Sequence, residues 1–222
     1  MKLLGTVFLL TVLGASAARA QPSDAPCVNG AVPTERDLGL AKVVGAGRLN
    51  FLNEGPGCPS EAATCRQRAY VVSGDLLLTG RSAGAYVCVF YPNTGGGSAG
   101  WVQSARLARL PVDVAPPPSA WAGRWANEDD SIVLKVKGAA LVADGHAYYP
   151  SAHPPASQFP GGPNLGDLSG TATPNGKTVV FTDKDPNGCT AALTLVGGLL
   201  VVADDGHCGG MNVSFSGVYT RK

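Results

Sequence analysis

Residues 188–219 constrain the fold more than any other stretch of this chain. Two apolar runs flank the glycine pair at 197–198, and glycines suit the positive φ angles of a two-residue hairpin turn. Folding the chain at this pair brings Cys189 level with Cys208. A third run, residues 211–220, alternates apolar and polar side chains, which is typical of a half-buried strand. The stretch therefore predicts an antiparallel sheet clasped by a disulfide.

The six cysteines of the chain indicate an oxidising compartment. Their even number, without a closely spaced CxxC pair, favours disulfides over a zinc site. A proline-rich segment, residues 111–120, separates four of them from the pair Cys189–Cys208, so each half can pair internally. The first four cysteines allow three pairings, and among these we favour Cys27–Cys88 with Cys58–Cys65.

Residues 1–20 have the pattern of a secretory signal peptide. Lys2 makes the start positive, residues 3–13 are apolar, and Ala18-Arg19-Ala20 is a small-x-small cleavage site. The alternative, an N-terminal membrane anchor, is disfavoured because the apolar run is shorter than a membrane-spanning helix. We therefore expect a periplasmic or secreted protein that is not stably inserted in a membrane once the signal is cleaved.

The charge balance argues against nucleic acid as a partner. The chain has 17 basic and 16 acidic residues, a formal net charge of +1, and no basic cluster along the sequence. Its 30 glycines and its charged fraction of only 15% suit a β-rich chain with many turns.

Short candidate strands, rich in β-branched and aromatic residues, predict an all-β chain in two parts. We expect residues 21–43 to be irregular and a first domain at residues 44–110. The prolines of residues 111–120 predict a stiff, extended spacer. Residues 121–222 contain eight candidate strands separated by turn signals. Eight successive antiparallel strands are best closed as an up-and-down barrel, because closure removes exposed edges.

The first part carries three short motifs. Gly74-Asp75 precedes a candidate strand, residues 86–91 are rich in aromatic side chains, and Gly100-Trp101-Val102 precedes a turn that ends at Leu107. Over about residues 44–110 these motifs resemble those of bacterial SH3-like domains. This chain departs from that outline by its extra cysteine-bearing loop before Tyr70.

The resemblance implies a small barrel with aromatic side chains along a peptide-binding groove. It makes Tyr86, Tyr91 and Trp101 the candidate binding residues. The alternative is that Trp101 and one tyrosine fill the core, since small domains readily bury their few aromatic side chains.

The second part begins with Gly123-x-Trp125 and ends with a strand that reads Tyr-Thr-Arg. Together with the predicted meander, this resembles the calycin outline of lipocalins, avidin-like barrels and small bacterial protease-inhibitor barrels. Trp121 and Trp125 are then expected to plug the barrel and not to stack on a ligand.

Motifs for catalysis or metal binding are weak. There is no Gly-x-Ser-x-Gly and no recognisable grouping of Ser, His and Asp. His207 follows Asp204 and Asp205, a sequence that a polar turn explains better than an acid–base or metal site. Asp183, Asp185 and Asn187 alternate as in a calcium loop, but the downstream Glu is missing. We expect no metal and no cofactor.

These patterns favour a non-catalytic binding protein of the bacterial envelope. Its SH3-like half would dock peptidoglycan peptide or an envelope protein. The alternative is a periplasmic inhibitor of a lysozyme or protease that acts through the C-terminal barrel. A third hypothesis, an enzyme, would have to use His207 and Asp205.

Overall fold

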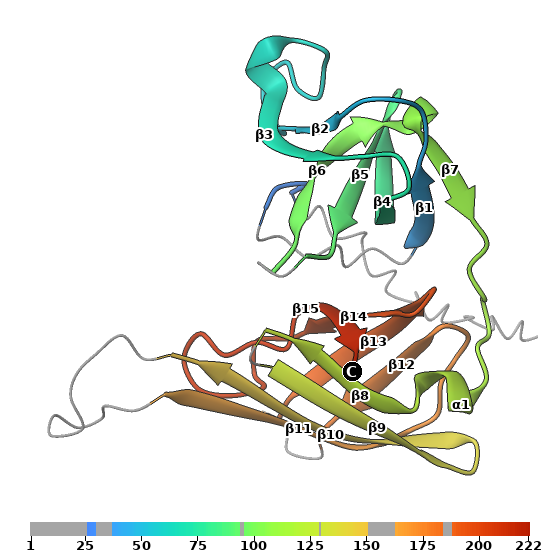
Figure 1. The fold of residues 1–222 in the computed structure, drawn as a ribbon. Helices are drawn as coiled ribbons and strands as arrows, with labels where there is room; N and C mark the ends of the chain where they lie inside the picture. The colour runs from blue at the N-terminus through green and yellow to red at the C-terminus, as the bar shows by residue number, and fades with distance from the viewer. Residues whose placement is uncertain (1–25, 30–36, 94–95, 129, 151–162, 184–187) are drawn as a thin grey trace, which may run out of the picture.

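The computed structural model describes residues 26–29, 37–93, 96–128, 130–150, 163–183 and 188–222. Within them the chain is almost entirely β-structure, arranged in two antiparallel sheets that lie one above the other in Figure 1. This confirms the all-β prediction. No helix in these residues is long and apolar enough to cross a membrane. The predicted signal peptide lies outside the described residues.

The first sheet has seven strands in the order β3-β2-β6-β5-β4-β1-β7. Its core is made mainly of aliphatic side chains, including Val43, Leu77, Val89 and Val102, around Phe51. The elements are β1 (Gly39–Val43), β2 (Leu49–Leu52), η1 (Ala63–Cys65), β3 (Arg66–Val71), β4 (Leu76–Ala83), β5 (Tyr86–Tyr91), β6 (Ser98–Gln103), η2 (Ser104–Arg106) and β7 (Leu107–Leu110).

Strand β1 lies at the end of the segment that we expected to be irregular, so that expectation is wrong for residues 39–43. Leu40 pairs with Leu78 of β4 on one side and with Leu110 of β7 on the other. The strand is short and holds a single β-branched residue, Val43, so its own sequence gives a weak signal. Its place between two neighbours stabilises it, because strand formation depends on cross-strand contacts more than on intrinsic preference.

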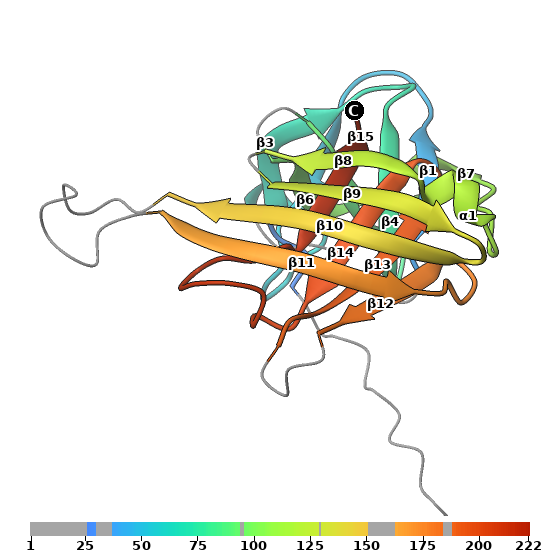
Figure 2. The ribbon, with the colours of Figure 1, turned by 90° about the horizontal axis from the view of Figure 1, so that it is seen from below.

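The second sheet is the predicted eight-stranded antiparallel barrel, nearly closed, in the order β11-β10-β9-β8-β15-β14-β13-β12. In Figure 2 the layer of β8 to β11 crosses over the layer of β12 to β15. The elements are α1 (Pro118–Trp121), β8 (Gly123–Asn127), β9 (Asp130–Lys137), β10 (Ala140–Tyr149), β11 (Asn164–Ala172), β12 (Thr178–Thr182), β13 (Thr190–Val196), β14 (Leu199–Asp204) and β15 (Gly217–Arg221).

The last strand is shorter than its alternating pattern predicts, since β15 begins only at Gly217. The backbone N–H of Phe215 donates to the Asp204 carboxylate, and the hydroxyls of Ser214 and Ser216 donate to it as well, at 3.0 Å each. In residues 214–216 these bonds to a side chain replace a strand ladder.

Side chains fill the interior of the barrel. Trp121 and Trp125 are fully buried, and the indole N–H of Trp125 donates to the Trp121 carbonyl at 2.8 Å. Ile132, Phe181 and Phe215 pack in the same cluster. The two tryptophans therefore plug the barrel, as predicted.

All three predicted disulfides form. Cys189–Cys208 joins the residue before β13 to the loop that follows β14. Cys27–Cys88 and Cys58–Cys65 hold the first half, which confirms the favoured pairing among the three that the sequence allows.

A separate buried cluster joins the two sheets. Leu40, Leu78 and Phe90 of the first sheet pack with Leu199 and Val201 of the barrel. The ammonium group of Lys177 also donates to the Leu38 carbonyl at 2.7 Å. The proline-rich segment, predicted as a stiff spacer, therefore connects two sheets that are in contact.

Candidate functional site

Trp101, the central residue of the predicted groove, lies in the interior. It is 3% exposed and packs with Cys27, Cys65 and Cys88. The Arg81 guanidinium lies 5.2 Å from the centroid of its ring. Cys27, Cys65 and Cys88 belong to the two disulfides of the first half, so the buried Trp101 ring packs on these disulfides and does not face an open groove.

Tyr86 and Tyr91 lie at opposite ends of β5 and are half-buried. They are an odd number of residues apart, so they face opposite sides of the strand. Tyr86 packs beside Trp101, whereas Tyr91 packs on the core that contains Val89. The three aromatic rings therefore do not line one common groove.

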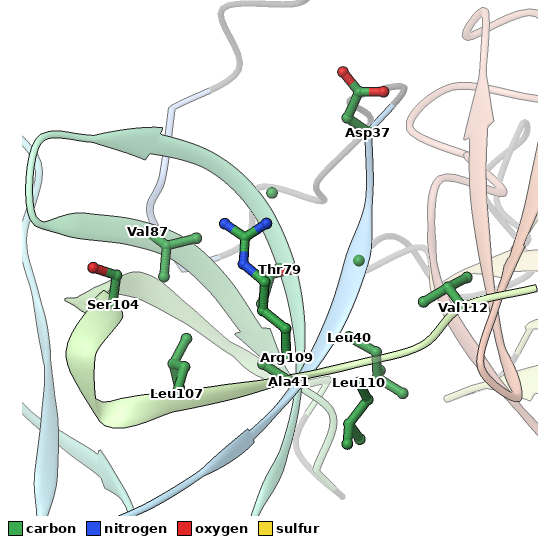
Figure 3. Close-up of a pocket in the computed structure, with 12 residues that line it drawn as sticks. Asp37, Leu40, Ala41, Thr79, Val87, Ser104, Leu107, Arg109, Leu110 and Val112 are labelled. Atoms are coloured by element: carbon green, nitrogen blue, oxygen red, sulfur yellow. The ribbon is translucent and has the colours of Figure 1, made fainter.

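A pocket of about 270 Å³ opens instead on the first sheet. It is built from β1, β4, β5 and β7, and Figure 3 shows Arg109 reaching up from β7 with Val87 and Leu107 on one side and Leu40 and Leu110 on the other. We call it the Arg109 pocket. It is lined by Asp37, Gly39, Leu40, Ala41, Thr79, Gly80, Val87, Ser104, Leu107, Arg109, Leu110 and Val112.

Apolar and charged groups are combined in the Arg109 pocket. Leu107 and Arg109 share one face of β7, because they are two residues apart on the strand. Arg109 is exposed and forms no ion pair with the carboxylates of the described residues. Asp37 supplies the opposite charge at the rim. Such a pocket can bury apolar groups of a ligand and pair with its carboxylate.

The Arg109 pocket was not found from the sequence because it depends on β1. Without that strand, residues 39–41 cannot be placed beside β7. The only local signal is Arg109 itself, a charged residue between Ala108 and Leu110 in a short run.

The His207 cluster forms the polar turn that the sequence favours. The backbone N–H of His207 donates to the Asp205 carboxylate at 3.0 Å, and Cys208 is held in its disulfide. This N–H bond, with a smaller contribution from the N–H of Thr190, lowers the pKa of Asp205. The carboxylate of Asp204 accepts bonds from Ser214, Phe215 and Ser216. Both carboxylates therefore order the loop.

Among the described residues, no group of three or more His, Cys, Asp or Glu side chains lies close enough together to hold a metal ion. Of the calcium-like residues, Asp185 and Asn187 lie outside the described residues, so that pattern stays untested.

No protein-family model, curated protein or solved structure matches this chain. The resemblances to SH3-like domains and calycins therefore stay predictions.

Proposed function

We propose that this chain is an exported, non-catalytic binding protein of the bacterial envelope, and that its first half docks a peptidoglycan peptide in the Arg109 pocket. The observation that carries the proposal is the Arg109 guanidinium, which pairs with no carboxylate of the described residues and lies beside apolar side chains in one open pocket. A peptide carboxylate would pair with Arg109, and an apolar side chain of the peptide would cover Leu107 and Val87.

The position of β7 also suits a peptide. β7 is the last strand in the order of the first sheet, so no strand of the described residues pairs with its outer edge. An extended peptide can add to such an edge through main-chain hydrogen bonds, while its side chains enter a neighbouring pocket. Arg109 and Leu107 lie on this strand.

Two observations support export. The three disulfides are compatible with an oxidising, extracellular location. The predicted signal, with Lys2 and the Ala18-Arg19-Ala20 site, would direct the chain there.

Co-sedimentation with purified peptidoglycan sacculi tests the proposal. The whole protein should be used, because separating the halves would expose the buried cluster that joins them. We expect the wild type to pellet and Arg109→Gln to bind about tenfold more weakly, as for a lost charge-assisted hydrogen bond. Arg124→Gln, at an exposed arginine on β8, is the matched control and should pellet like the wild type. A wild type that stays in the supernatant would refute wall binding.

A second candidate function, inhibition of a lysozyme or protease, is favoured by the β10–β11 hairpin. The hairpin extends beyond the rest of the barrel in Figure 2. Tyr148 and Leu165 pair across it, and they are 42% and 62% exposed. Exposed apolar side chains on two paired strands are suited to bind in the cleft of an enzyme.

Titration against lysozyme and secreted proteases tests this second function. We expect inhibition by the wild type and about a tenfold weaker effect for Leu165→Asp, which puts a charge in the contact. Val180→Asp makes the same change at an exposed valine of β12 and should inhibit normally. Full enzyme activity at micromolar excess of the wild type would argue against the inhibitor function.

A further inference from the structure

Three arginines from distant parts of the sequence meet at a second pocket of the first sheet. Arg48 precedes β2, Arg66 begins β3, and Arg106 ends η2. All three line one pocket of about 270 Å³, together with Asn50, Glu61 and others. We call it the arginine pocket. It shares no lining residue with the Arg109 pocket.

Two of the three guanidinium groups are held in place. Arg106 donates to the carbonyls of Val44 and Ala46, at 2.8 and 3.0 Å. The Arg48 guanidinium lies 4.3 Å from the centroid of the Tyr70 ring, a cation–π contact. Both charges are therefore fixed before a ligand arrives, which lowers the entropy cost of binding.

The positive charge of the arginine pocket is not neutralised by the residues that the structure describes. None of the three arginines forms an ion pair with a carboxylate there. Glu61 is the one acidic residue in the lining, and its carboxylate accepts hydrogen bonds from neutral partners, the Gln103 amide and the Tyr86 hydroxyl. Arg68 is exposed two residues after Arg66, so it adds positive charge on the same side of β3.

We propose that the arginine pocket binds a phosphate group. Three guanidinium groups and one carboxylate leave an excess of two positive charges, which matches the charge of −1.5 to −2 on a phosphomonoester at pH 7. Arginine is the side chain best suited to this task, because its planar fork donates two parallel hydrogen bonds to phosphate oxygens. A carboxylate, with a single charge, would leave the pocket partly unneutralised.

Calorimetric titration with inorganic pyrophosphate tests the proposal on the purified protein. We expect saturable binding that weakens as salt is added, because the charges are near the surface. In the double variant Arg48→Gln/Arg66→Gln binding should fall by about a hundredfold, roughly tenfold for each lost charge-assisted contact. Glu61→Gln should bind more tightly than the wild type, because it removes the one negative charge and keeps a hydrogen-bond acceptor for Gln103 and Tyr86.

Arg124→Gln is again the matched control, since it removes one exposed guanidinium from the barrel. It should bind pyrophosphate like the wild type. Absence of binding, equal loss in Arg124→Gln and the double variant, or weaker binding in Glu61→Gln would each overturn the proposal. None of these outcomes depends on the Arg109 pocket, so sacculus binding can fail or succeed independently.

A parallel arm identifies the source of the phosphate. Vesicles of phosphatidylcholine with one fifth phosphatidic acid present phosphomonoesters on a surface, whereas pyrophosphate is free in solution. Binding of both probes, each reduced in the double variant, assigns the site to phosphate groups that include lipid headgroups. Binding of pyrophosphate alone assigns it to a phosphate group that is free in solution.

Discussion

The phenol of Tyr219 is a buried acidic group. Its hydroxyl donates to the Phe215 carbonyl at 2.9 Å inside the barrel. Burial raises the pKa of Tyr219 well above its ordinary value of 10.0, and the negative charges of Asp130 and Asp204 act in the same direction. The folded protein therefore keeps this proton at a pH where the unfolded chain releases it.

This difference predicts a loss of stability in alkali. The folded-state pKa is raised, so the stabilising effect is complete below about pH 10 and is lost as the pH rises above it. In that range the free energy of unfolding should fall by about 1.4 kcal/mol per pH unit. Urea unfolding of wild type and Tyr219→Phe at several values between pH 9 and pH 11.5 measures the slope.

The variant should lack this slope, whereas Tyr148→Phe, at an exposed tyrosine, should keep it. At neutral pH, Tyr219→Phe should be about 1–3 kcal/mol less stable, because the Phe215 carbonyl is left buried without a donor. Parallel slopes in the wild type and Tyr219→Phe would mean that this tyrosine is not buried in solution.

Disulfides constrain the elements over very different lengths of chain. The sequence separations are 61 for Cys27–Cys88, 19 for Cys189–Cys208 and 7 for Cys58–Cys65. A cross-link stabilises mainly by lowering the entropy of the unfolded chain, and the effect grows with the logarithm of the closed loop.

Paired Cys→Ser substitutions should therefore lower the free energy of unfolding in that order. The expected losses are about 4, 3 and 2 kcal/mol for closed loops of these lengths. Denaturant unfolding of the three double variants measures them. A loss from removing Cys58–Cys65 that exceeds the loss from removing Cys27–Cys88 would contradict the entropic explanation.

Elements whose own residues specify their structure, through turn glycines or paired cysteines, were predictable from the sequence. The hairpin of β13 and β14 follows from Gly197 and Gly198, both of which have positive φ angles, and from Cys189 and Cys208. Strand β1 could not be predicted, because its neighbours β4 and β7 stabilise it. The start of the last strand was misjudged because a side chain, Asp204, competes with the strand ladder for the Phe215 N–H.

The candidate sites likewise differ in whether they depend on local sequence or on residues that only the fold brings together. The sequence left two places open for Trp101, a binding groove or the core, and the structure buries it against Cys27 and Cys88. The sequence has no basic cluster, whereas the fold gathers Arg48, Arg66 and Arg106 in one pocket. The composition of the chain cannot reveal this cluster of positive charge, because the three arginines are far apart in sequence and only the fold brings them together.

At the scale of the whole molecule, the contact between the two sheets decides whether they act together. Leu40 of β1 is 6% exposed and packs in the cluster that includes Val196 and Leu199 of the barrel. β1 also lines the Arg109 pocket. A change on the barrel side of the cluster is therefore expected to reach that pocket through Leu40.

A double-mutant cycle tests this contact. A Cβ added at Gly197 would lie 2.6 Å from Cδ2 of Leu40, so this buried side chain would have to shift. Gly197→Ala should cost about 1–2 kcal/mol for its positive φ, and about 1–3 kcal/mol more for this overlap. In a Leu40→Ala background the overlap disappears, so the two substitutions together should destabilise less than the sum of their separate effects.

Gly198→Ala is the control, because no atom lies within 4 Å of the Cβ added there. Its cost should be the same in the wild-type and Leu40→Ala backgrounds. Chemical denaturation of the single and double variants gives the coupling energies. Additivity of Gly197→Ala with Leu40→Ala would mean that the sheets are not in contact at this point in solution, and a binding site on the first sheet would then be independent of the barrel.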